Sequence, residues 1–416
     1  MFRADLHIHS RFSRATSKNL TLRNLASYAC IKGIHLLGTG DITHPKWLQE
    51  IADELIYNEQ TGFYQLKTPL NPHDILTQTN IRVETVSFNP QFILQGEISC
   101  IYKKKGATRK NHQLIFVPHL EAAKKLNAKL AQIGNLSADG RPILGLDAKI
   151  LLELVLAMSD TKSPNYLIPA HIWTPWFSVF GSKSGFNSLE ECFEELTSEI
   201  FALETGLSSD PPMNRLWSAL DKYTLISNSD AHSGENLGRE VNCFHSAPNY
   251  QSLFDALKKK NDLFSGTVEF YPEEGKYFAD GHRNCNICFL PEESKKYHNL
   301  CPVCGTPLTI GVLNRVKELA DRKAPLTEKI RFESCIPLKE ILSELYHAGA
   351  KTKHIHSLYE KYINLFGSEL NILQNVPIEH ISKTDTALAE SLFKMRSGTL
   401  QKICGFDGKY GKITTL

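Results

Sequence analysis

The stretch Asp5-Leu6-His7-Ile8-His9-Ser10, close to the N-terminus, decides how the rest of the chain is interpreted. Residues 2–8 are predicted to form a strand, and side chains at alternate positions of a strand share one face. Asp5, His7 and His9 are therefore expected to point together, while Leu6 and Ile8 point the other way. Imidazole and carboxylate groups are the usual ligands of zinc, manganese and iron. The stretch therefore predicts a metal site at the first strand.

Further imidazole and carboxylate groups follow, nearly all just beyond predicted strand ends, and the last motif is Ser229-Asp230-Ala231-His232. Such a number of donors, drawn from several strands, predicts more than one metal ion. Clustered metals hydrolyse phosphate esters because they activate a water and neutralise charge on the attacking and leaving oxygens. The predicted metal ligands are His7, His9, Asp41, His44, Glu97, His112, His171, Asp230 and His232. Four other histidines have no such context and are expected to be structural: His35, His73, His119 and His245.

Strand and helix patterns alternate along the first 270 residues. Thr21 can cap a helix that runs to Lys32, and Gly33 can end it. Short strands are predicted at residues 34–37, 92–95, 114–117, 166–169, 200–203 and 224–227. Ligands at successive strand ends favour a (β/α) barrel, whose chemistry gathers at its C-terminal rim, over a doubly wound open sheet. His112 stands at the start of its predicted strand and fits this arrangement least well.

A second motif consists of Cys285-Asn-Ile-Cys288 and Cys301-Pro-Val-Cys304, which 12 residues separate. Two Cys-x-x-Cys pairs at this spacing predict a tetrahedral structural zinc site formed by Cys285, Cys288, Cys301 and Cys304. Such a ribbon either staples the fold or contacts nucleic acid or a partner, and the sequence leaves both uses open. The other six of the ten cysteines are scattered, which suits a reducing cytoplasm better than a disulfide framework.

The length of 416 residues predicts two or three domains. We expect a barrel at residues 1–270, a zinc ribbon at 281–310 and a small helical C-terminal domain at 311–416 with a basic, glycine-rich tail. The tail is expected to be disordered, or to form a short strand or peptide that docks elsewhere. Residues 281–416 carry a net charge of +5 and residues 1–280 a net charge of −3. This asymmetry indicates either contact with a polyanion or an ordinary solvated helical surface.

Several functional classes are disfavoured by what the sequence lacks. The first residues enter a strand directly without a signal peptide, and no apolar run approaches the length of a membrane span. We therefore expect a cytoplasmic protein with no membrane contact. No phosphate-binding loop of the G-x-x-x-x-G-K-[ST] type is present, and Gly181-Ser-Lys-Ser-Gly185 lacks its spacing. We therefore expect no use of ATP.

Taken together, Asp5-x-His7-x-His9-Ser10, the Gly-Asp41 turn, Glu97, His112, His171 and Asp230-x-His232 resemble the polymerase-and-histidinol-phosphatase (PHP) domain. The resemblance covers residues 1–270 and implies a distorted seven-stranded (β/α) barrel that commonly carries a trinuclear metal centre. Many members of that family have another histidine shortly after the first motif, where this chain has Arg11-Phe-Ser-Arg-Ala. Many also have Asp-His at the second motif, where this chain has Asp41-Ile42. These departures leave the number of ligands open.

A narrower resemblance extends along the whole chain. Residues 39–45, 168–177, 180–185 and 204–211, followed by the four-cysteine ribbon, resemble the endonuclease Q family, which nicks DNA on the 5′ side of deaminated bases (hypoxanthine, uracil, xanthine) and abasic sites. The resemblance implies a metal-dependent DNA phosphodiesterase with two or three divalent metals (Zn, Mn, Mg or Fe) in the barrel and one structural zinc in the ribbon. It also implies damaged DNA and a replication sliding clamp as partners. It assigns catalysis to Asp230, His171 and Glu97, and gives Asp5 the role of orienting a ligating histidine.

Recognition of the lesion is predicted to involve the loop after His171. A deaminated base differs from its parent at the Watson–Crick edge, so the nucleotide is expected to leave the stack. Aromatic rings in the loop could wedge the duplex or stack on a base, and Lys183 could hold a phosphate. The alternative is that the rings simply pack the barrel rim. The predicted substrate-binding residues are Trp173, Trp176, Phe177, Ser182 and Lys183.

Two other functions remain as alternatives. One is a PHP-type small-molecule phosphoesterase, such as a histidinol-phosphate or nucleotide phosphatase. The ribbon and the basic tail disfavour it, because a small substrate needs neither. The other is a DNA-binding module whose metals only stabilise the barrel, which the nearly complete set of ligands disfavours.

Overall fold

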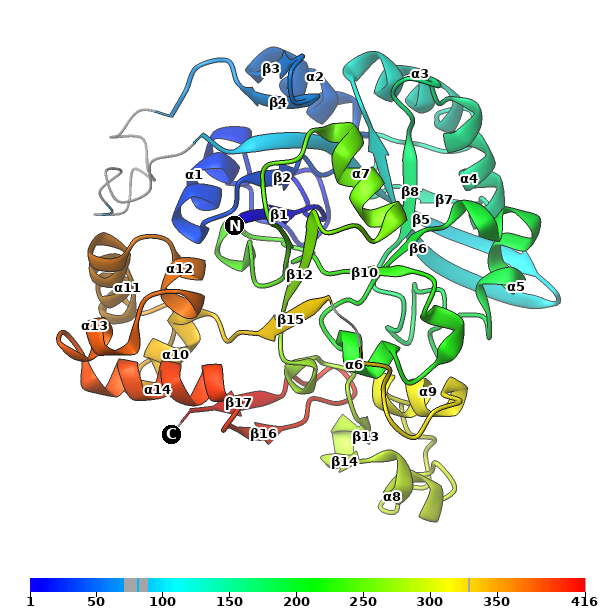
Figure 1. Ribbon diagram of the computed structural model, residues 1–416. Coiled ribbons are helices and arrows are strands. Elements are labelled where there is room, and N and C mark those ends of the chain that lie inside the picture. The colour runs from blue at the N-terminus through cyan, green and yellow to red at the C-terminus, as the bar shows by residue number, and fades with distance from the viewer. Residues whose placement is uncertain (71–80, 82–88, 328–329, 416) are drawn as a thin grey trace.

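The structure is a computed structural model of the chain, and it describes residues 1–70, 81, 89–327 and 330–415. It shows a mixed α/β fold (Figure 1). Within the described residues, one large sheet has the strand order β15-β12-β11-β1-β2-β5-β4-β3, and β6 extends it from β5 to β8 while β7 pairs with β5. Its strands are β1 (Phe2–Asp5), β2 (Leu36–Gly38), β3 (Leu55–Asn58), β4 (Phe63–Leu66), β5 (Gln91–Lys104), β6 (Ala107–Val117), β7 (Ile143–Leu144), β8 (Tyr166–Pro169), β11 (Val241–Phe244), β12 (Phe264–Glu269) and β15 (Arg331–Ser334).

Three two-stranded sheets complete the β structure of the described residues. They are β9 (Ala202–Glu204) with β10 (Thr224–Ile226), β13 (Asp280–His282) with β14 (Ile287–Phe289), and β16 (Gln401–Ile403) with β17 (Lys412–Thr414). The parallel pair β9–β10 is not hydrogen-bonded into the large sheet, and an isolated bridge between Ile8 and Ala231 connects the segments that follow β1 and β10. The α/β class is thus confirmed, whereas a closed seven-stranded barrel is not.

Helices flank the sheet as the sequence pattern predicts. Thr21 caps α1 by accepting a hydrogen bond from the Asn24 amide, and Gly33 ends it in the left-handed region at φ 87°. The prediction of this helix is confirmed at both ends. The helices are α1 (Leu22–Lys32), α2 (Pro45–Glu54), α3 (Leu120–Leu130), α4 (Ala148–Ala157), α5 (Leu189–Phe193), α6 (Pro211–Asn214), α7 (Tyr250–Lys259), α8 (Pro291–Lys296), α9 (Val312–Leu319), α10 (Leu338–Leu345), α11 (Lys353–Phe366), α12 (Glu369–Gln374), α13 (Ile378–Ser382) and α14 (Thr386–Ser397).

The long hairpin β5–β6 differs most from the sequence prediction. The predicted strand at residues 92–95 continues to Lys104, so Glu97 lies inside a strand instead of after one. In the antiparallel register Glu97 pairs with Leu114, and Ser99 pairs with His112. Side chains alternate along each strand, so the diagonal neighbours Glu97 and His112 share one face of the hairpin. The pairing explains why His112 serves the site although it does not follow a strand end.

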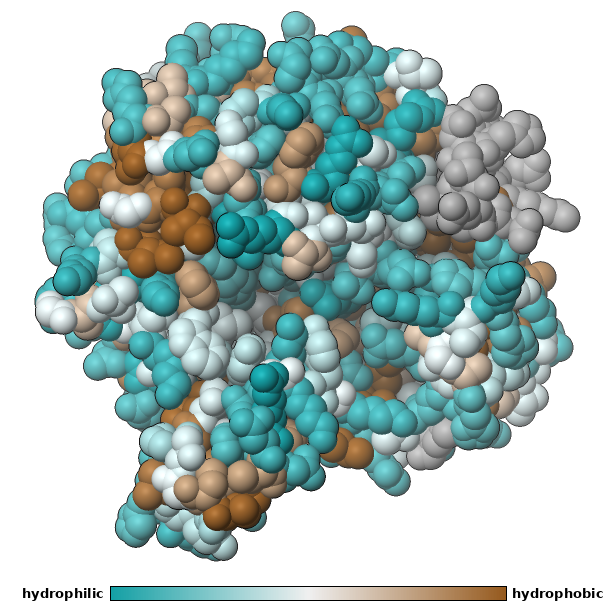
Figure 2. Space-filling model, turned by 180° about the vertical axis from the view of Figure 1, so that it is seen from behind, coloured by the Kyte–Doolittle hydropathy of each residue, from teal (hydrophilic) through white to brown (hydrophobic). Residues whose placement is uncertain are grey.

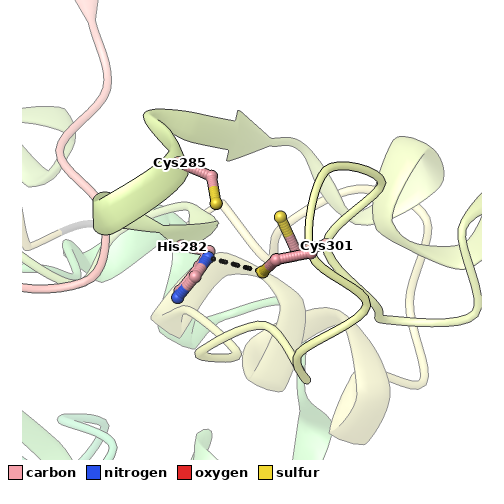
Figure 3. A group of neighbouring side chains, drawn as sticks. His282, Cys285 and Cys301 are labelled. Carbon is pink, nitrogen blue, oxygen red and sulfur yellow. Dashed lines mark hydrogen bonds between the residues drawn. The ribbon is translucent and has the colours of Figure 1, made fainter.

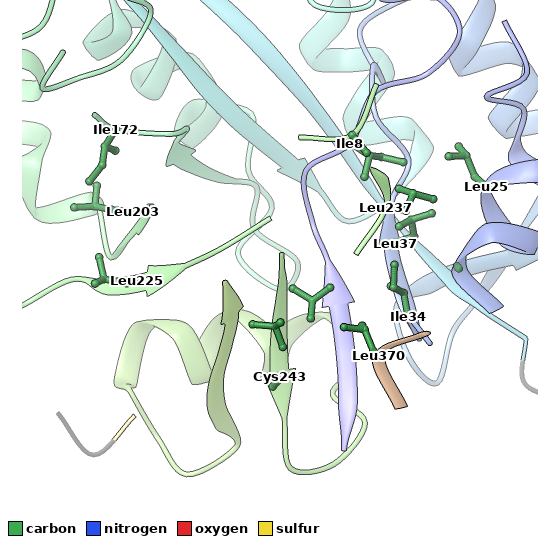
Figure 4. Close-up of a cluster of buried hydrophobic side chains, with 14 of the residues drawn as sticks. Ile8, Leu25, Ile34, Leu37, Ile172, Leu203, Leu225, Leu237, Cys243 and Leu370 are labelled. Atoms are coloured by element: carbon green, nitrogen blue, oxygen red, sulfur yellow. The ribbon is translucent and has the colours of Figure 1, made fainter. Parts of the chain in front are cut away.

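The hydrophobic core is continuous between the β structure and the C-terminal helices. Leu37 of β2, Leu203 of β9 and Leu225 of β10 belong to one buried cluster (Figure 4). Leu370 of α12 lies in the same cluster, and β15 pairs with β12 in the large sheet. The C-terminal region therefore shares its packing with the first 270 residues, and the three-domain division remains a prediction.

The glycine-rich tail docks as a short hairpin. The Ile413 amide of β17 donates to Glu274 Oε1 at 3.1 Å, and the Gly411 amide donates to the Glu274 carbonyl oxygen at 3.0 Å. Of the two expectations for the tail, the docked strand is the one that the structure contains. Among the described residues, no helix combines the length and the apolar character that a membrane span requires.

The region around β13, β14 and α8 projects from the rest of the molecule (Figures 1 and 2). Its surface exposes several large hydrophobic side chains: Leu290, Tyr297, Leu300 and Val303.

Candidate metal centre and its surroundings

The turns that follow three of the strands direct functional side chains inward. Asp41, His171 and Asp230 follow β2, β8 and β10, and all three have positive φ angles, of 49°, 26° and 46°. A residue other than glycine in this conformation typically costs on the order of 1–3 kcal/mol, and such residues concentrate at functional sites. Two of these three side chains, His171 and Asp230, enter the groups described next.

The first group of potential metal ligands comprises His7, His9, Glu97 and Asp230, whose ligand atoms all lie within 4.8 Å of one another. His9 Nε2 is 3.0 Å from Asp230 Oδ1 and 3.3 Å from Glu97 Oε2. The side chains of His7, His9 and Glu97 are fully buried, whereas that of Asp230 is 27% exposed. The group is therefore accessible from its Asp230 side.

The second group comprises Glu97, His112 and His171, again within 4.8 Å. Glu97 Oε1 lies 2.6 Å from His112 Nδ1 and 3.2 Å from His171 Nε2. Glu97 thus turns one oxygen toward each group, which is the geometry of a carboxylate that bridges two neighbouring metal ions. Adjacent divalent ions of this kind act together in phosphodiester hydrolysis.

A buried nitrogen of His7 without a hydrogen-bond partner indicates that the site suits a metal. His7 Nε2 is buried and has no hydrogen-bond partner, although buried ring nitrogens normally have one. The opposite nitrogen, Nδ1, is held 3.0 Å from Glu204 Oε1. A histidine ring that is anchored through one nitrogen and has the other free is the usual arrangement of a metal ligand. The donor set and this free nitrogen fit divalent metals.

Glu204 is a positioning residue that is not among the ligands predicted from the sequence. It is buried, and besides His7 it accepts hydrogen bonds from the His171 amide and from Asn228 Nδ2, both at 2.8 Å. It lies at the end of β9, within the stretch 204–211 that carries the family resemblance. That position in the sequence could have indicated a functional role. It fixes the orientation of His7 and the turn that carries His171.

Electrostatics keep the carboxylates ionised. Burial alone would raise the pKa of Glu97, but His112, Arg141 and His7 hold it well below its usual value. Burial alone would likewise raise the pKa of Asp230, but His7 and His9 hold the pKa of its carboxyl well below its usual value. For His112, burial outweighs the attraction of Glu97 and lowers the pKa to about 4. The carboxylates are thus charged, which is the form that binds a metal. They in turn raise the pKa of His7, His9 and His171, so a metal that binds there would displace protons from these rings.

Asp41, a predicted ligand, lies outside both groups and orients His9 instead. Its Oδ2 accepts from the Ser10 amide at 2.7 Å and from the Ser10 hydroxyl at 2.5 Å. Its Oδ1 accepts from Ser13 Oγ at 2.9 Å and lies 3.2 Å from His9 Nδ1. Both oxygens are therefore engaged by protein groups. Ser13 stands in the segment where many PHP proteins carry an additional histidine.

Three more assignments from the sequence differ from the geometry. His44 precedes α2 and stacks on Phe12 with ring centroids 4.3 Å apart, outside both groups. His232 lies beside His9 at 4.4 Å between rings, but its Nδ1 is 2.8 Å from the Asp230 carbonyl oxygen and it also belongs to neither group. Asp5 does not orient a histidine, because its carboxylate accepts the backbone amides of Ser229 and Gly238 at 3.1 and 3.0 Å.

The structural histidines have ordinary roles where they are described. His35 Nδ1 accepts from the Arg3 amide at 3.2 Å, and His119 caps α3 by accepting from the Ala122 amide at 3.1 Å. His245 is exposed, and His73 lies outside the described residues.

The ribbon brings together a different set of ligands from the predicted one. Cys285, Cys301 and Cys304 converge with His282, not with Cys288. Figure 3 shows His282, Cys285 and Cys301 gathered at one place. Cys304 Sγ lies 3.5 Å from His282 Nδ1, whereas Cys288 Sγ lies 4.0 Å from the Cys404 carbonyl oxygen. In the hairpin β13–β14, Cys288 pairs with Gly281 and His282 pairs with Ile287. Adjacent positions of a strand face opposite sides, so Cys288 and His282 point away from each other.

The loop after His171 divides into packed and exposed aromatic residues. Trp173 is 1% exposed, and its Nε1 donates to Asn214 Oδ1 at 2.7 Å, so its assignment to substrate contact does not hold. Trp176 is 37% exposed. Phe177 is partly buried, with its ring 4.9 Å from that of His112. Lys183 is exposed, and Ser182 Oγ donates to the Ile310 carbonyl oxygen at 3.1 Å.

Comparisons with known proteins show relatives in sequence and in structure. A family model described as the MJ0043 C-terminal domain matches residues 337–399. The chain is 34% identical over 250 residues to MJ0043 of Methanocaldococcus jannaschii, a match that covers 58% of this chain and 31% of that protein. It is 30% identical over 423 residues to YqxK of Bacillus subtilis, covering 99% of this chain and 98% of YqxK.

Two solved structures have the same fold over nearly the whole chain. The lesion-specific endonuclease PfuEndoQ from Pyrococcus furiosus matches with a TM-score of 0.83 at 28% identity, covering 99% of this chain and 94% of the other. An endonuclease Q in complex with a 27-mer duplex substrate, with an abasic lesion at its active site, matches with the same TM-score and identity, covering 99% and 96%. YqxK matches along the whole sequence, the two solved structures share the fold of the chain from end to end, and the chain belongs to the endonuclease Q family.

Proposed function

We propose that the protein is a metal-dependent DNA endonuclease that hydrolyses the phosphodiester on the 5′ side of deaminated bases (hypoxanthine, uracil, xanthine) or abasic sites. The observation that carries the proposal is Glu97, whose two oxygens face two groups of metal ligands within a family that includes a lesion-specific endonuclease. The abasic duplex at the active site of one relative supports damaged DNA as the substrate class. The sliding clamp and the cytoplasmic location remain predictions from the sequence.

The metal centre is proposed to hold two or three divalent ions within a distorted barrel, and Glu97 would serve as a ligand in both groups. A third ion would need Asp41, His44 or His232, which belong to neither group. Imidazole-rich donors favour Zn, Mn or Fe over Mg, because Mg prefers oxygen ligands. When bound, such ions supply an activated water and neutralise charge on the leaving oxygen.

The chain's own residues hold and orient this centre. His7, His9 and Asp230 would hold one ion, and His112 and His171 would hold another. Glu204 fixes the ring of His7 through Nδ1, and Asp41 fixes the ring of His9 in the same way. Of the predicted catalytic residues, Asp230 is the ligand that is open to the surface, so the scissile phosphate is expected to approach beside it.

Lesion recognition is proposed for the exposed part of the aromatic loop. Trp176 and Phe177 lie next to the second ligand group, since the ring of Phe177 contacts that of His112. Lys110 lies 5.5 Å above the ring of Phe177, and Lys183 is exposed on the same loop. Aromatic faces interleaved with cations are typical of surfaces that bind unstacked nucleotides.

A nicking assay tests the proposal. Duplexes that carry one abasic site, uracil or hypoxanthine are incubated with the manganese- or zinc-loaded protein, beside an undamaged duplex and a plain phosphomonoester. We expect cuts on the 5′ side of the lesion, lost in Asp230→Asn and kept in Asp255→Asn, a surface carboxylate paired with Lys259. Hydrolysis of the phosphomonoester alone would favour the small-molecule phosphatase. Lesion binding without cutting would favour the binding module.

A further inference from the structure

Arg141 places a cation at the edge of the metal centre. Its Nη1 donates to Glu97 Oε2 at 3.0 Å, the same oxygen that faces His9 Nε2 at 3.3 Å. Glu97 is fully buried, whereas the Arg141 side chain is 26% exposed. The guanidinium thus reaches from the buried Glu97 carboxylate to the surface.

The backbone around Arg141 is built tightly onto the site. The Gly140 amide donates to the Phe12 carbonyl oxygen at 2.9 Å, and the Pro142 carbonyl accepts from the Ser99 amide of β5 at 3.0 Å. A Cβ atom at position 140 would lie 2.2 Å from Asp41 Oδ2, so only glycine allows this approach. The Arg141 amide itself donates to Asp139 Oδ1 at 3.1 Å. The loop therefore directs Arg141 at the centre with both of its neighbours fixed.

Arg141 donates its hydrogen bond to Glu97 Oε2, and Glu97 would need this same oxygen to bind a metal ion in the first group. With divalent ions bound by Glu97, the guanidinium would face cations at close range and would lack its main counter-charge. A planar guanidinium is well matched to the oxygens of a phosphate, which it can bind through two parallel hydrogen bonds. A phosphate at the metals would restore the balance of charge.

We propose that Arg141 binds a non-bridging oxygen of the scissile phosphate and stabilises the charge that develops there. This inference rests on the proposed function of the same site as a phosphodiesterase. The competing explanation is that Arg141 only neutralises Glu97 and keeps the loop folded.

Binding of inorganic phosphate to the metal-loaded protein tests the contact without relying on DNA. Calorimetry compares the wild type with Arg141→Met and with Arg322→Met, a control arginine whose guanidinium pairs with Asp221. We expect affinity for phosphate to fall about tenfold or more in Arg141→Met, with metal content unchanged, and to stay at the wild-type value in Arg322→Met. Equal affinity in all three proteins would overturn the proposal. If Arg141→Met does not hold its metals, Arg141→Gln takes its place, because the amide can still donate to Glu97 without the charge.

Single-turnover nicking of an abasic duplex gives the second readout. Loss of one preorganised donor to a developing oxyanion typically slows the chemical step by about 10²–10³-fold. We expect a loss of that size in Arg141→Met and a partial recovery in Arg141→Lys. On a duplex with a neutral methylphosphonate at the scissile position, the nicking rates of the wild type and of Arg141→Met should become similar. Nicking by Arg141→Met at the wild-type rate would refute the inference alone. A wild type that binds phosphate through Arg141 but nicks no lesion would refute only the proposed function.

Discussion

The centre around Glu97 and the ribbon hold potential metal ligands in opposite ways. The donors of the Glu97 centre come from residues as distant as His7 and Asp230, they are imidazoles and carboxylates, and one side of the site is partly exposed. The ribbon draws His282, Cys285, Cys301 and Cys304 from one short segment. Four thiolate and imidazole donors complete a tetrahedral zinc and leave no position for water, whereas a site with an accessible edge can admit a substrate. The comparison favours chemistry at the Glu97 centre and a stabilising role for the ribbon.

The aromatic loop connects the two regions. Arg315 of α9, which follows the ribbon, donates through Nε to the Phe180 carbonyl at 2.9 Å and through Nη2 to the Phe186 carbonyl at 3.0 Å. The ring of Trp176 meets that of Tyr277 at 5.7 Å between centroids. The ribbon side of the molecule therefore anchors the loop whose exposed face we propose to read the lesion.

The largest effect is expected from the bridging carboxylate. Glu97→Gln keeps the shape of the side chain but weakens both ligand groups, so we expect metal content to fall and nicking to drop by about 10³-fold or more, beyond the roughly 10–100-fold typical of residues that only orient ligands. Elemental analysis and single-turnover kinetics measure both effects. Glu121→Gln, a surface carboxylate on α3 paired with Lys124, is the matched control. Full metal occupancy in Glu97→Gln would argue against a bridge.

The next effect separates the two possible ligand sets of the ribbon. We expect His282→Ala and Cys285→Ser each to release one zinc and to destabilise the ribbon. The metals of the centre around Glu97 should remain bound. Cys288→Ser should keep that zinc, because the Cys288 side chain faces the other side of the hairpin. Zinc stoichiometry and thermal melting of the three variants decide the matter. Zinc loss in Cys288→Ser together with retention in His282→Ala would restore the four-cysteine site predicted from the sequence.

A smaller effect is expected from two tryptophans of the connecting loop. Trp176→Ala should slow nicking of damaged duplexes about 10–100-fold more than that of damaged single strands, because a single strand needs less unstacking. Its melting temperature should not change. Trp173→Ala should instead lower the free energy of unfolding by about 3–5 kcal/mol, since it empties a buried position. Equal losses on both substrates in Trp176→Ala, with a lower melting temperature, would assign that ring to packing.

The smallest effect concerns Glu274, whose carboxyl accepts the Ile413 amide of the tail hairpin β16–β17. Burial, aided by Glu340, raises its pKa from 4.5 to about 8. The folded protein therefore keeps a proton that the unfolded chain releases, so the free energy of unfolding should decrease as pH rises from about 4.5 to about 8, by on the order of 1–4 kcal/mol. Urea unfolding across this range should show a weaker decrease in Glu274→Gln than in the control Glu390→Gln, an exposed carboxylate. An identical pH dependence in both variants would show that Glu274 titrates normally.

Local patterns were sufficient to predict the helix from Leu22 to Lys32, several short strands and most of the potential metal ligands around Glu97. These features follow from local rules, namely capping residues, hydrophobic periodicity and donor residues near strand ends. The same rules placed Glu97 after a strand, because Gly96 and a charged residue indicate a break. In the fold, cationic partners compensate that charge and the strand continues.

Which donors meet depends on long-range packing. Asp41 and His44 have the same residue types as the grouped donors, but Ser10 and Ser13 engage Asp41 and Phe12 packs on His44. Arg141 and Glu204 acquire their roles from partners 44 and 197 positions away, and no local pattern predicts such a contact. Cys288 has the correct spacing but the opposite face of its hairpin. Spacing fixes which residues are available, whereas side-chain direction and competing hydrogen bonds, set by strand pairing and packing, decide which of them can bind the metal.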